Sequence, residues 1–163
     1  MTNEIIQQQL TEAFGEQLTD WETPYEMLTF TAPVDAGANV LGFLRDTMGF
    51  GFLTDLTAVH YPERTDQELC VVYLLNNMPE RIRVRMKVYI PVANPEIPTA
   101  TGLFATANWL ERETYDFFGV QFTGHPDLTR IMNSEEMDYF PLRKEYTVED
   151  PTRKDKDDAM FGR

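Results

Sequence analysis

Charged side chains gather most densely in the segment from Trp109 to Asp116, within an otherwise apolar stretch. Glu111, Arg112, Glu113 and Asp116 fall on successive turns of an expected helix, where Arg112 and Asp116, four residues apart, can form an ion pair. Paired carboxylates at this spacing could transfer protons. The alternative is an ion-pair network that fixes the helix against the following loop. The sequence favours this alternative, because no nucleophile or group of metal ligands lies nearby.

Two histidines and one cysteine limit the metal and redox chemistry of the chain. Iron-sulfur clusters and structural zinc sites need several thiolates or imidazoles, whereas His60, His125 and Cys70 are scattered. A disulfide within the chain is impossible. His125 precedes Pro126, so its backbone is expected to be extended, and its ring could accept a proton or make a structural hydrogen bond. We therefore expect no metal or redox centre.

A row of basic residues occupies alternate positions of a predicted strand, at Arg81, Arg83, Arg85 and Lys87. Neighbours in such a row lie about 6.6 Å apart on one face of the sheet. The row could bind an acidic partner, or it could be a solvated face balanced by the surplus acids of the chain itself. For a protein partner the sequence favours neither interpretation. Phosphate-binding motifs of the GxGxxG or GxxxxGK[ST] type are absent from the sequence.

The composition describes one acidic, globular domain. The 163 residues include 14 Lys and Arg and 27 Asp and Glu, a formal net charge of −13 that disfavours nucleic acid as a partner. A hydrophobic content of 42% is enough for a core of ordinary size. We find neither an apolar run of about 20 residues that could span a bilayer nor a secretory leader. We expect a cytoplasmic chain that reaches a membrane only through a partner.

Hydrophobic periodicity predicts an α+β fold. A helix that starts behind Asn3 as its N-cap is followed by helices over 38–48 and 102–118. Strands are expected over 28–32, 50–60, 69–75 and 81–90. This order predicts a mixed sheet of about four strands packed with two to three helices, plus an extended C-terminal tail. We expect residues 1–133 to form the α+β domain and residues 134–163 a partner-binding tail, of which residues 150–163 cannot order by themselves.

Three stretches of the sequence have an order of residues that is typical of one protein family. They read WLERETYDFFG over 109–119, FTGHPDLTRI over 122–131 and PLRKEY over 141–146, and FLTDLTAVHYP over 52–62 precedes them. Together they resemble the C subunit, of the 30 kDa subunit family, of respiratory complex I, the NADH:quinone oxidoreductase. The resemblance spans roughly residues 40 to 146. It departs from the family pattern at Tyr139, Phe140 and Glu145, where Gly, His and Asp are usual.

The resemblance implies a cofactor-free structural subunit of the hydrophilic arm of complex I. Its partners would be the quinone-site D subunit and the cluster-bearing B and I subunits. FMN and iron-sulfur clusters in partner subunits would carry electrons from NADH to quinone, coupled to proton translocation. The chain would then lie at the cytoplasmic face of the cell membrane, held by the complex. The alternatives are the equivalent subunit of a membrane-bound hydrogenase or other quinone-linked dehydrogenase, and a free-standing hydrolase using Glu113, Asp116 and His125.

The resemblance also assigns motif or partner-interface positions, and no catalytic, cofactor-binding or metal-binding ones. They form a helix group, a loop group and a tail group: Glu111, Arg112, Glu113, Asp116 and Gly119; His125, Pro126, Asp127, Leu128 and Arg130; and Pro141, Leu142, Arg143 and Lys144. We expect these residues to fix the loop and the tail that contact the quinone-site D subunit.

Overall fold

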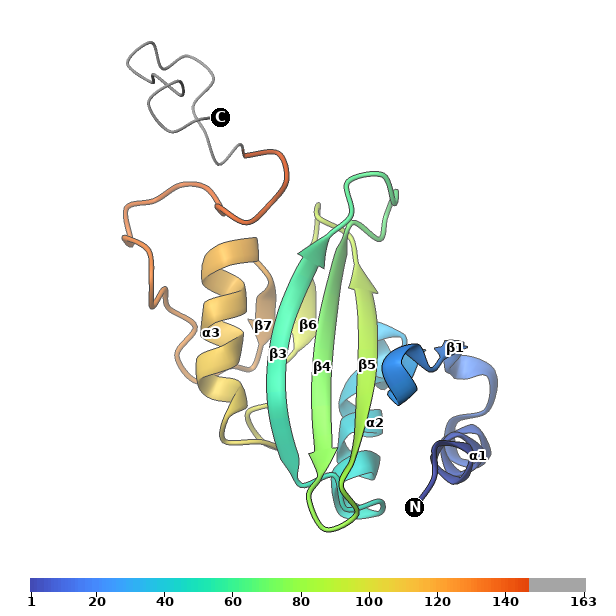
Figure 1. Cartoon of the computed structure of the whole chain (residues 1–163). Helices are drawn as coiled ribbons and strands as arrows, with labels where there is room; N and C mark the ends of the chain where they lie inside the picture. Colours follow the sequence, from blue (N-terminus) through green and yellow to red (C-terminus); the bar gives the residue numbers. More distant parts are fainter. Residues whose placement is uncertain (147–163) are drawn as a thin grey trace, which may run out of the picture.

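The computed structural model describes residues 1–146 of the chain (Figure 1). The prediction for residues 150–163 lies outside these described residues. The helices and strands follow the order α1 (Asn3–Phe14), β1 (Thr19–Glu22), β2 (Leu28–Thr31), α2 (Val34–Asp46), β3 (Phe52–His60), β4 (Leu69–Asn77), β5 (Ile82–Ile90), β6 (Glu96–Pro98), α3 (Ala107–Phe118) and β7 (Gln121–Thr123), with short 3-10 turns at Gly15–Gln17 and Pro24–Glu26.

The main sheet has five strands in the order β1-β2-β5-β4-β3. Strand β2 pairs in parallel with β5, and the other neighbouring strands pair antiparallel. A second, two-stranded sheet joins β6 to β7 in parallel. The predicted α+β class with a mixed sheet is therefore confirmed. Strands β1, β6 and β7 were not predicted, because each has only one large hydrophobic residue and so shows no period, whereas the equally short β2 alternates Leu28 and Phe30 with threonines.

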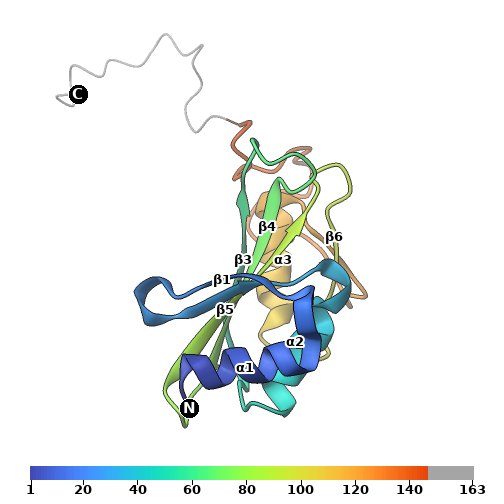
Figure 2. The ribbon, with the colours of Figure 1, turned by 90° about the vertical axis from the view of Figure 1, so that its right-hand side faces the viewer.

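Strand β5 shows how the sequence builds the core. Its alternate residues Val84, Met86 and Val88 are completely buried, whereas Arg83 and Arg85 reach solvent from the other face. A Cβ atom at Gly37 of α2 would lie 3.7 Å from Cγ2 of Val88, so the buried face of the strand meets α2. Figure 2 shows α2 on one side of the sheet and the β1–β2 hairpin projecting from the other.

Helix α3 packs along β3, at the edge of the sheet (Figure 1). The hydroxyl of Thr106 donates to the carbonyl oxygen of Leu53 at 3.2 Å, and the hydroxyl of Thr114 is shared between the carbonyl oxygens of Leu110, at 2.8 Å, and Leu56, at 3.3 Å. The bonds to Leu53 and Leu56 use backbone groups of an edge strand that have no strand partner of their own. The edge of the sheet is therefore covered by α3.

Several predicted boundaries were wrong. Thr2, not Asn3, precedes α1, and the amide of Asn3 donates to the carbonyl oxygen of Glu26. Helix α3 starts at Ala107, because residues 101–103 form a turn instead of its first turn. Arg81 precedes β5 with a φ of 54°, so the basic row loses its first member from the strand. Within residues 1–146, no helix is long and apolar enough to cross a membrane.

Candidate partner-binding site on helix α3, the loop and the tail

Asp116 is the buried centre of the predicted motif residues. Its Oδ2 accepts the backbone N–H groups of Ile131, Met132 and Asn133 at 3.2, 2.7 and 2.9 Å. Its Oδ1 accepts Nη1 of Arg130 at 2.8 Å and the side-chain amide of Asn133 at 3.1 Å. Burial alone would raise the pKa of this carboxyl, but the Asn133 and Met132 amides and the Arg130 guanidinium hold it well below its usual range. Asp116 therefore acts as an ionised anchor for the loop.

Arg130 connects the helix, the loop and the tail. Besides the Asp116 carboxylate, it binds the carbonyl oxygen of Asp116 at 2.9 Å. Its Nη2 donates to the carbonyl oxygens of Met137 and Tyr139 at 2.9 and 3.1 Å. The guanidinium lies 5.1 Å from the centre of the Phe140 ring. The side chain is almost completely buried, so one arginine orders three segments that are separate in the sequence.

The tail is fixed against the C-terminal end of α3 at Gly119. This glycine ends the helix with a φ of 77°, and its N–H donates to the carbonyl oxygen of Tyr115 at 2.8 Å. An added Cβ would lie only 2.5 Å from Cε2 of Phe140 and 2.6 Å from Nη2 of Arg143. Nε of Arg143 donates to the carbonyl oxygen of Phe118 at 2.7 Å. Only glycine allows both the left-handed turn and this close approach of the tail.

The remaining tail residues continue along the same end of the domain. The N–H of Leu142 donates to the carbonyl oxygen of Phe117 at 3.2 Å. The N–H of Lys144 donates to Nδ1 of the buried His60, the last residue of β3, at 3.0 Å. Pro141 precedes them as a half-buried residue. Residues 141–144 are thus attached to both α3 and the sheet.

Glu111 is completely buried one turn before Thr114 and lies apart from the Asp116 group. Its Oε2 accepts the hydroxyl of Thr99 at 2.5 Å, and its Oε1 accepts the N–H of Ala100 at 2.6 Å. Burial raises the pKa of this carboxyl from 4.5 to about 7, against the opposing effect of the two donors. Glu111 therefore attaches α3 to the segment after β6.

The predicted ion pair between Arg112 and Asp116 is wrong. Arg112 instead binds the carbonyl oxygen of Thr129 at 3.1 Å and its hydroxyl at 2.9 Å, and it lies over the Trp109 ring. Residues four apart share one side of a helix, but the Asp116 carboxylate pairs with Arg130 and the Arg112 guanidinium with Thr129, both from the following loop. Glu113 is exposed on the helix.

The loop residues are held by the ring of His125. Its Nε2 lies 3.1 Å from the carbonyl oxygen of Asn108, and its Nδ1 accepts the N–H of Asp127 at 3.0 Å. This pattern requires the Nε2–H tautomer, and both nitrogens are then engaged. Pro126 and Asp127 are exposed, and Leu128 packs on the edge of the core. The structural hydrogen bond is thus the role that the geometry gives to His125.

The three residues of the hydrolase hypothesis do not line a common hollow. Both oxygens of Asp116 and both ring nitrogens of His125 are already bonded within the chain. The nearby hollow, of about 210 Å³, is lined by Tyr115, Leu128, Thr129, Arg130 and Glu135 and contains none of the three residues of the hydrolase hypothesis. Within residues 1–146, no three His, Cys, Asp or Glu side chains are grouped closely enough to hold a metal ion.

Apolar side chains lie exposed around this internal network. Trp109 is 64% exposed, Met132 70% and Leu142 53%, and Tyr139 and Tyr146 are also exposed. Among them only Leu142 was predicted as a candidate interface position. The others could not be found from periodicity, because most of them lie in irregular segments where buried and exposed positions do not alternate.

Comparisons with known proteins show which proteins the chain is similar to. The sequence profile described as "Respiratory-chain NADH dehydrogenase, 30 Kd subunit" matches residues 30–152. The C subunit of the NADH-quinone oxidoreductase of Geobacter sulfurreducens is 36% identical over 144 residues, which cover 88% of this chain and 89% of that protein. The C 1 subunit of the NADH-quinone oxidoreductase of Rhizobium meliloti is 42% identical over 141 residues, which cover 85% and 69% of the two chains.

Two solved structures have the same fold. A trypsin-resistant fragment of Nqo5 matches with a TM-score of 0.67 and 33% identity, and the match covers 76% of this chain and 98% of that one. A chain of the membrane-bound sulfane sulfur reductase, an archaeal respiratory membrane complex, matches with a TM-score of 0.75 and 27% identity, over 89% and 85% of the two chains.

Proposed function

Because the chain belongs to the family of the 30 kDa subunit of respiratory-chain NADH dehydrogenase, we propose that it is a structural subunit of NADH:quinone oxidoreductase. In this role it supports electron transfer from NADH to quinone, coupled to proton translocation, without a catalytic group of its own. The motifs quoted from the sequence all fall within the part of the chain on which the family match rests.

The observation that carries this proposal is that the charged side chains of the motifs form hydrogen bonds and ion pairs within the chain itself. The polar groups of Asp116, Arg130 and Arg143 form hydrogen bonds that order the loop and the tail. Large apolar side chains, notably Trp109 and Met132, are left at the surface there, beside exposed acids such as Glu113. Large exposed apolar side chains on a rigid base are typical of a protein–protein interface. The arrangement fits a scaffold better than an enzyme.

We propose the D subunit, which bears the quinone site, as the main partner of this surface, with the cluster-bearing B and I subunits nearby. FMN and the iron-sulfur clusters would then belong to partner subunits, and this chain would hold none. The complex would keep the chain at the cytoplasmic face of the cell membrane. The scattered positions of Cys70, His60 and His125 support the proposal that the chain has no redox centre.

A second candidate is the equivalent subunit of a membrane-bound hydrogenase or another quinone-linked dehydrogenase. The observation in its favour is the likeness to the sulfane sulfur reductase chain, whose TM-score of 0.75 exceeds the 0.67 of the Nqo5 fragment. The two candidates differ in whether an NADH-oxidising flavin subunit is part of the assembly.

The proposal is tested by a pull-down of the tagged chain from detergent-solubilised native membranes, with mass spectrometry of the partners and an assay of NADH:quinone activity. We expect the D, B and I subunits, a flavin subunit and NADH:quinone activity in the eluate. Hydrogenase-type partners without a flavin subunit would support the second candidate. Recovery of the chain alone would contradict both.

A further inference from the structure

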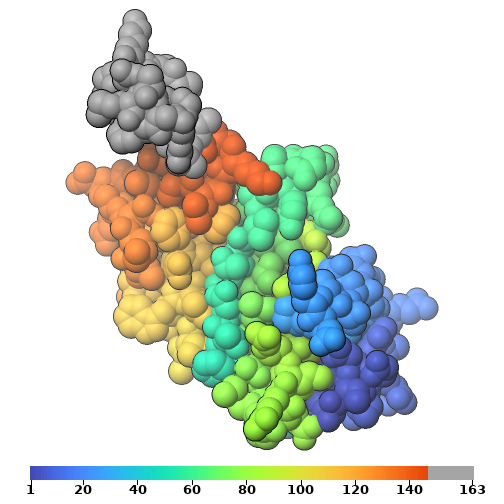
Figure 3. Space-filling model, in the orientation of Figure 1, coloured from blue at the N-terminus to red at the C-terminus, as the bar shows by residue number. Residues whose placement is uncertain are grey.

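The face of the main sheet opposite α2 has no helix on it within residues 1–146, and we call it the open face. Strands β5, β4 and β3 contribute the following side chains to it: Arg83, Arg85, Lys87, Tyr89, Val72, Leu74, Asn76, Phe52, Asp55, Thr57 and Val59. Figure 3 shows residues of these strands at the surface between α3 and the β1–β2 segment. A two-layer fold normally leaves such a face polar.

The open face is neither uniformly polar nor uniformly charged. The register places Leu74 beside Arg85 and Val72 beside Lys87, so an apolar column on β4 lies next to a basic column on β5. Adjacent strands are about 4.8 Å apart, so one bound segment can contact both columns at once. Phe52 extends the apolar side at β3 and is 45% exposed.

The basic column is only partly neutralised by the chain itself. Nζ of Lys87 pairs with Oε1 of Glu22 at 2.5 Å, but Arg83 and Arg85 form no ion pair with any residue of the described part of the chain. Asp55, on β3, is separated from Arg85 by Leu74. Two guanidinium groups therefore remain available beside apolar side chains.

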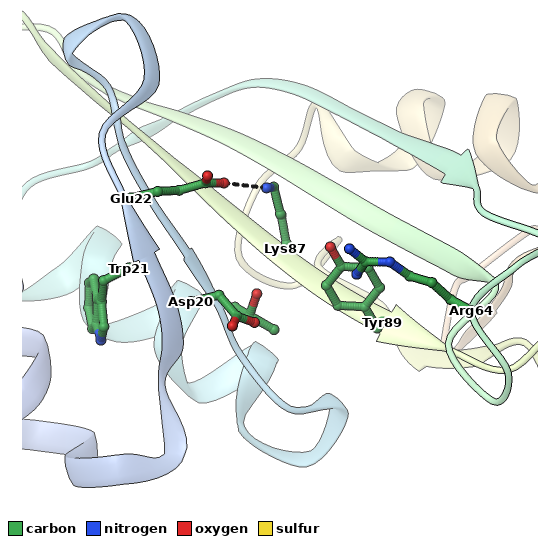
Figure 4. Close-up of a pocket in the computed structure, with 7 residues that line it drawn as sticks. Asp20, Trp21, Glu22, Arg64, Lys87 and Tyr89 are labelled. Carbon is green, nitrogen blue, oxygen red and sulfur yellow. Dashed lines mark hydrogen bonds and ion pairs between the residues drawn. The ribbon is translucent and has the colours of Figure 1, made fainter.

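A hollow next to Lys87 extends this surface toward the loop between β3 and β4 (Figure 4). It measures about 360 Å³ and is lined by Asp20, Trp21, Glu22, Thr31, Arg64, Lys87 and Tyr89. The guanidinium of Arg64 lies 4.8 Å from the centre of the Tyr89 ring and 5.1 Å from that of Tyr61. Cation–π contacts with these two aromatic rings hold Arg64, a third arginine, beside the basic column of β5. The acidic side chains in the lining of this hollow are Asp20 and Glu22, both on β1.

We propose that the open face binds an acidic segment of a partner subunit, whose carboxylates contact Arg83 and Arg85 and whose apolar side chains cover Val72 and Leu74. The inference rests on the proposed function only in requiring that the chain works inside an assembly. The net charge of −13 does not prevent such binding, because solution ions screen exposed charges beyond about 8 Å at physiological ionic strength. Local complementarity then selects an acidic partner over a basic one.

The proposal is tested by photo-crosslinking in the assembled complex. A benzophenone amino acid replaces Phe52 in one tagged strain and Thr57 in another, since both side chains are exposed on the open face. After irradiation of native membranes, mass spectrometry maps the crosslinked segment. We expect one acidic segment of a partner subunit, and at least a fivefold weaker crosslink in the Arg83→Glu/Arg85→Glu background.

The matched control is Arg83→Lys/Arg85→Lys, which keeps the charge and should keep at least half of the crosslink. Replacing the mapped acids by Lys should restore the crosslink to the Glu variant. A crosslink to lipid, to a second copy of this chain or to a segment without acids would overturn the proposal, as would no crosslink in chains that still co-purify with their partners. Failure to co-purify in the unmodified strain would instead contradict the proposed function.

Discussion

Asp116 holds the loop after β7 by charge, and its removal provides a residue-scale prediction. Asp116→Asn removes the buried partner of Arg130 and turns an amide group toward N–H donors. We expect a loss of about 2–4 kcal/mol in the free energy of unfolding, measured by chemical denaturation. Glu113→Gln, an exposed change on the same helix, should stay within about 0.5 kcal/mol of the wild type.

The same pair of proteins should differ in pH dependence. The pKa of Asp116 is lower in the folded chain than in the unfolded one, so its ionised form stabilises the fold above about pH 4. This stabilisation is lost as the pH falls further. The difference in unfolding free energy between wild type and Asp116→Asn should therefore shrink below about pH 4. A difference that stayed constant with pH would contradict the role of the charge.

Glu111 should have the opposite effect. Its pKa rises from 4.5 to about 7 on folding, so between these values the folded chain binds more protons than the unfolded chain. Stability should then fall as the pH rises from 4.5 to about 7. Glu111→Gln should flatten this slope, whatever its absolute stability. Denaturation series at several pH values measure it, and an unchanged slope would show that Glu111 ionises in the fold as it does in water.

At the scale of elements, the joint between α3 and the tail depends on Gly119. Gly119→Ala places a methyl group against Phe140 and Arg143 at a φ of 77°. We expect a destabilisation of about 1 kcal/mol or more and faster proteolysis of the tail than in the wild type. Gly102→Ala is the control, because a Cβ there meets no atom within 4 Å. Equal proteolysis rates in the two variants would contradict the proposed fit.

Elements with a strong period could be predicted from the sequence, and those without one could not. Strand β5 alternates over its whole length, so its buried Val84 and Met86 and its solvent-facing Arg83 were predicted correctly. Strands β1 and β7 are formed by pairing with another segment, β1 with the next strand β2 and β7 with β6 on the far side of α3 in the sequence, and such pairing leaves no trace in three or four residues. For the same reason the contact of Asp116 with Arg130 could not be predicted, and its neighbour Arg112 was chosen instead.

At the scale of the whole molecule, the apolar surface formed by α3, the loop and the tail is expected to control binding of the quinone-site subunit. Leu142→Glu places a charge on an apolar side chain of the tail that is 53% exposed, and it leaves the backbone bond from Leu142 to Phe117 in place. We expect a loss of partner binding of about tenfold or more, because a buried unpaired charge at an interface is strongly unfavourable. Ile5→Glu, on the outside of α1 and 45% exposed, makes the same chemical change far from the site and should leave binding unchanged.

The most direct test of the scaffold role is therefore quantitative co-purification of the quinone-site subunit with tagged wild-type, Leu142→Glu and Ile5→Glu chains from native membranes. We predict equal recovery of this partner with wild type and Ile5→Glu, and a loss of about tenfold or more with Leu142→Glu. NADH:quinone activity in the eluate should fall in parallel. Equal recovery with all three chains, or no recovery with the wild type, would contradict the scaffold role.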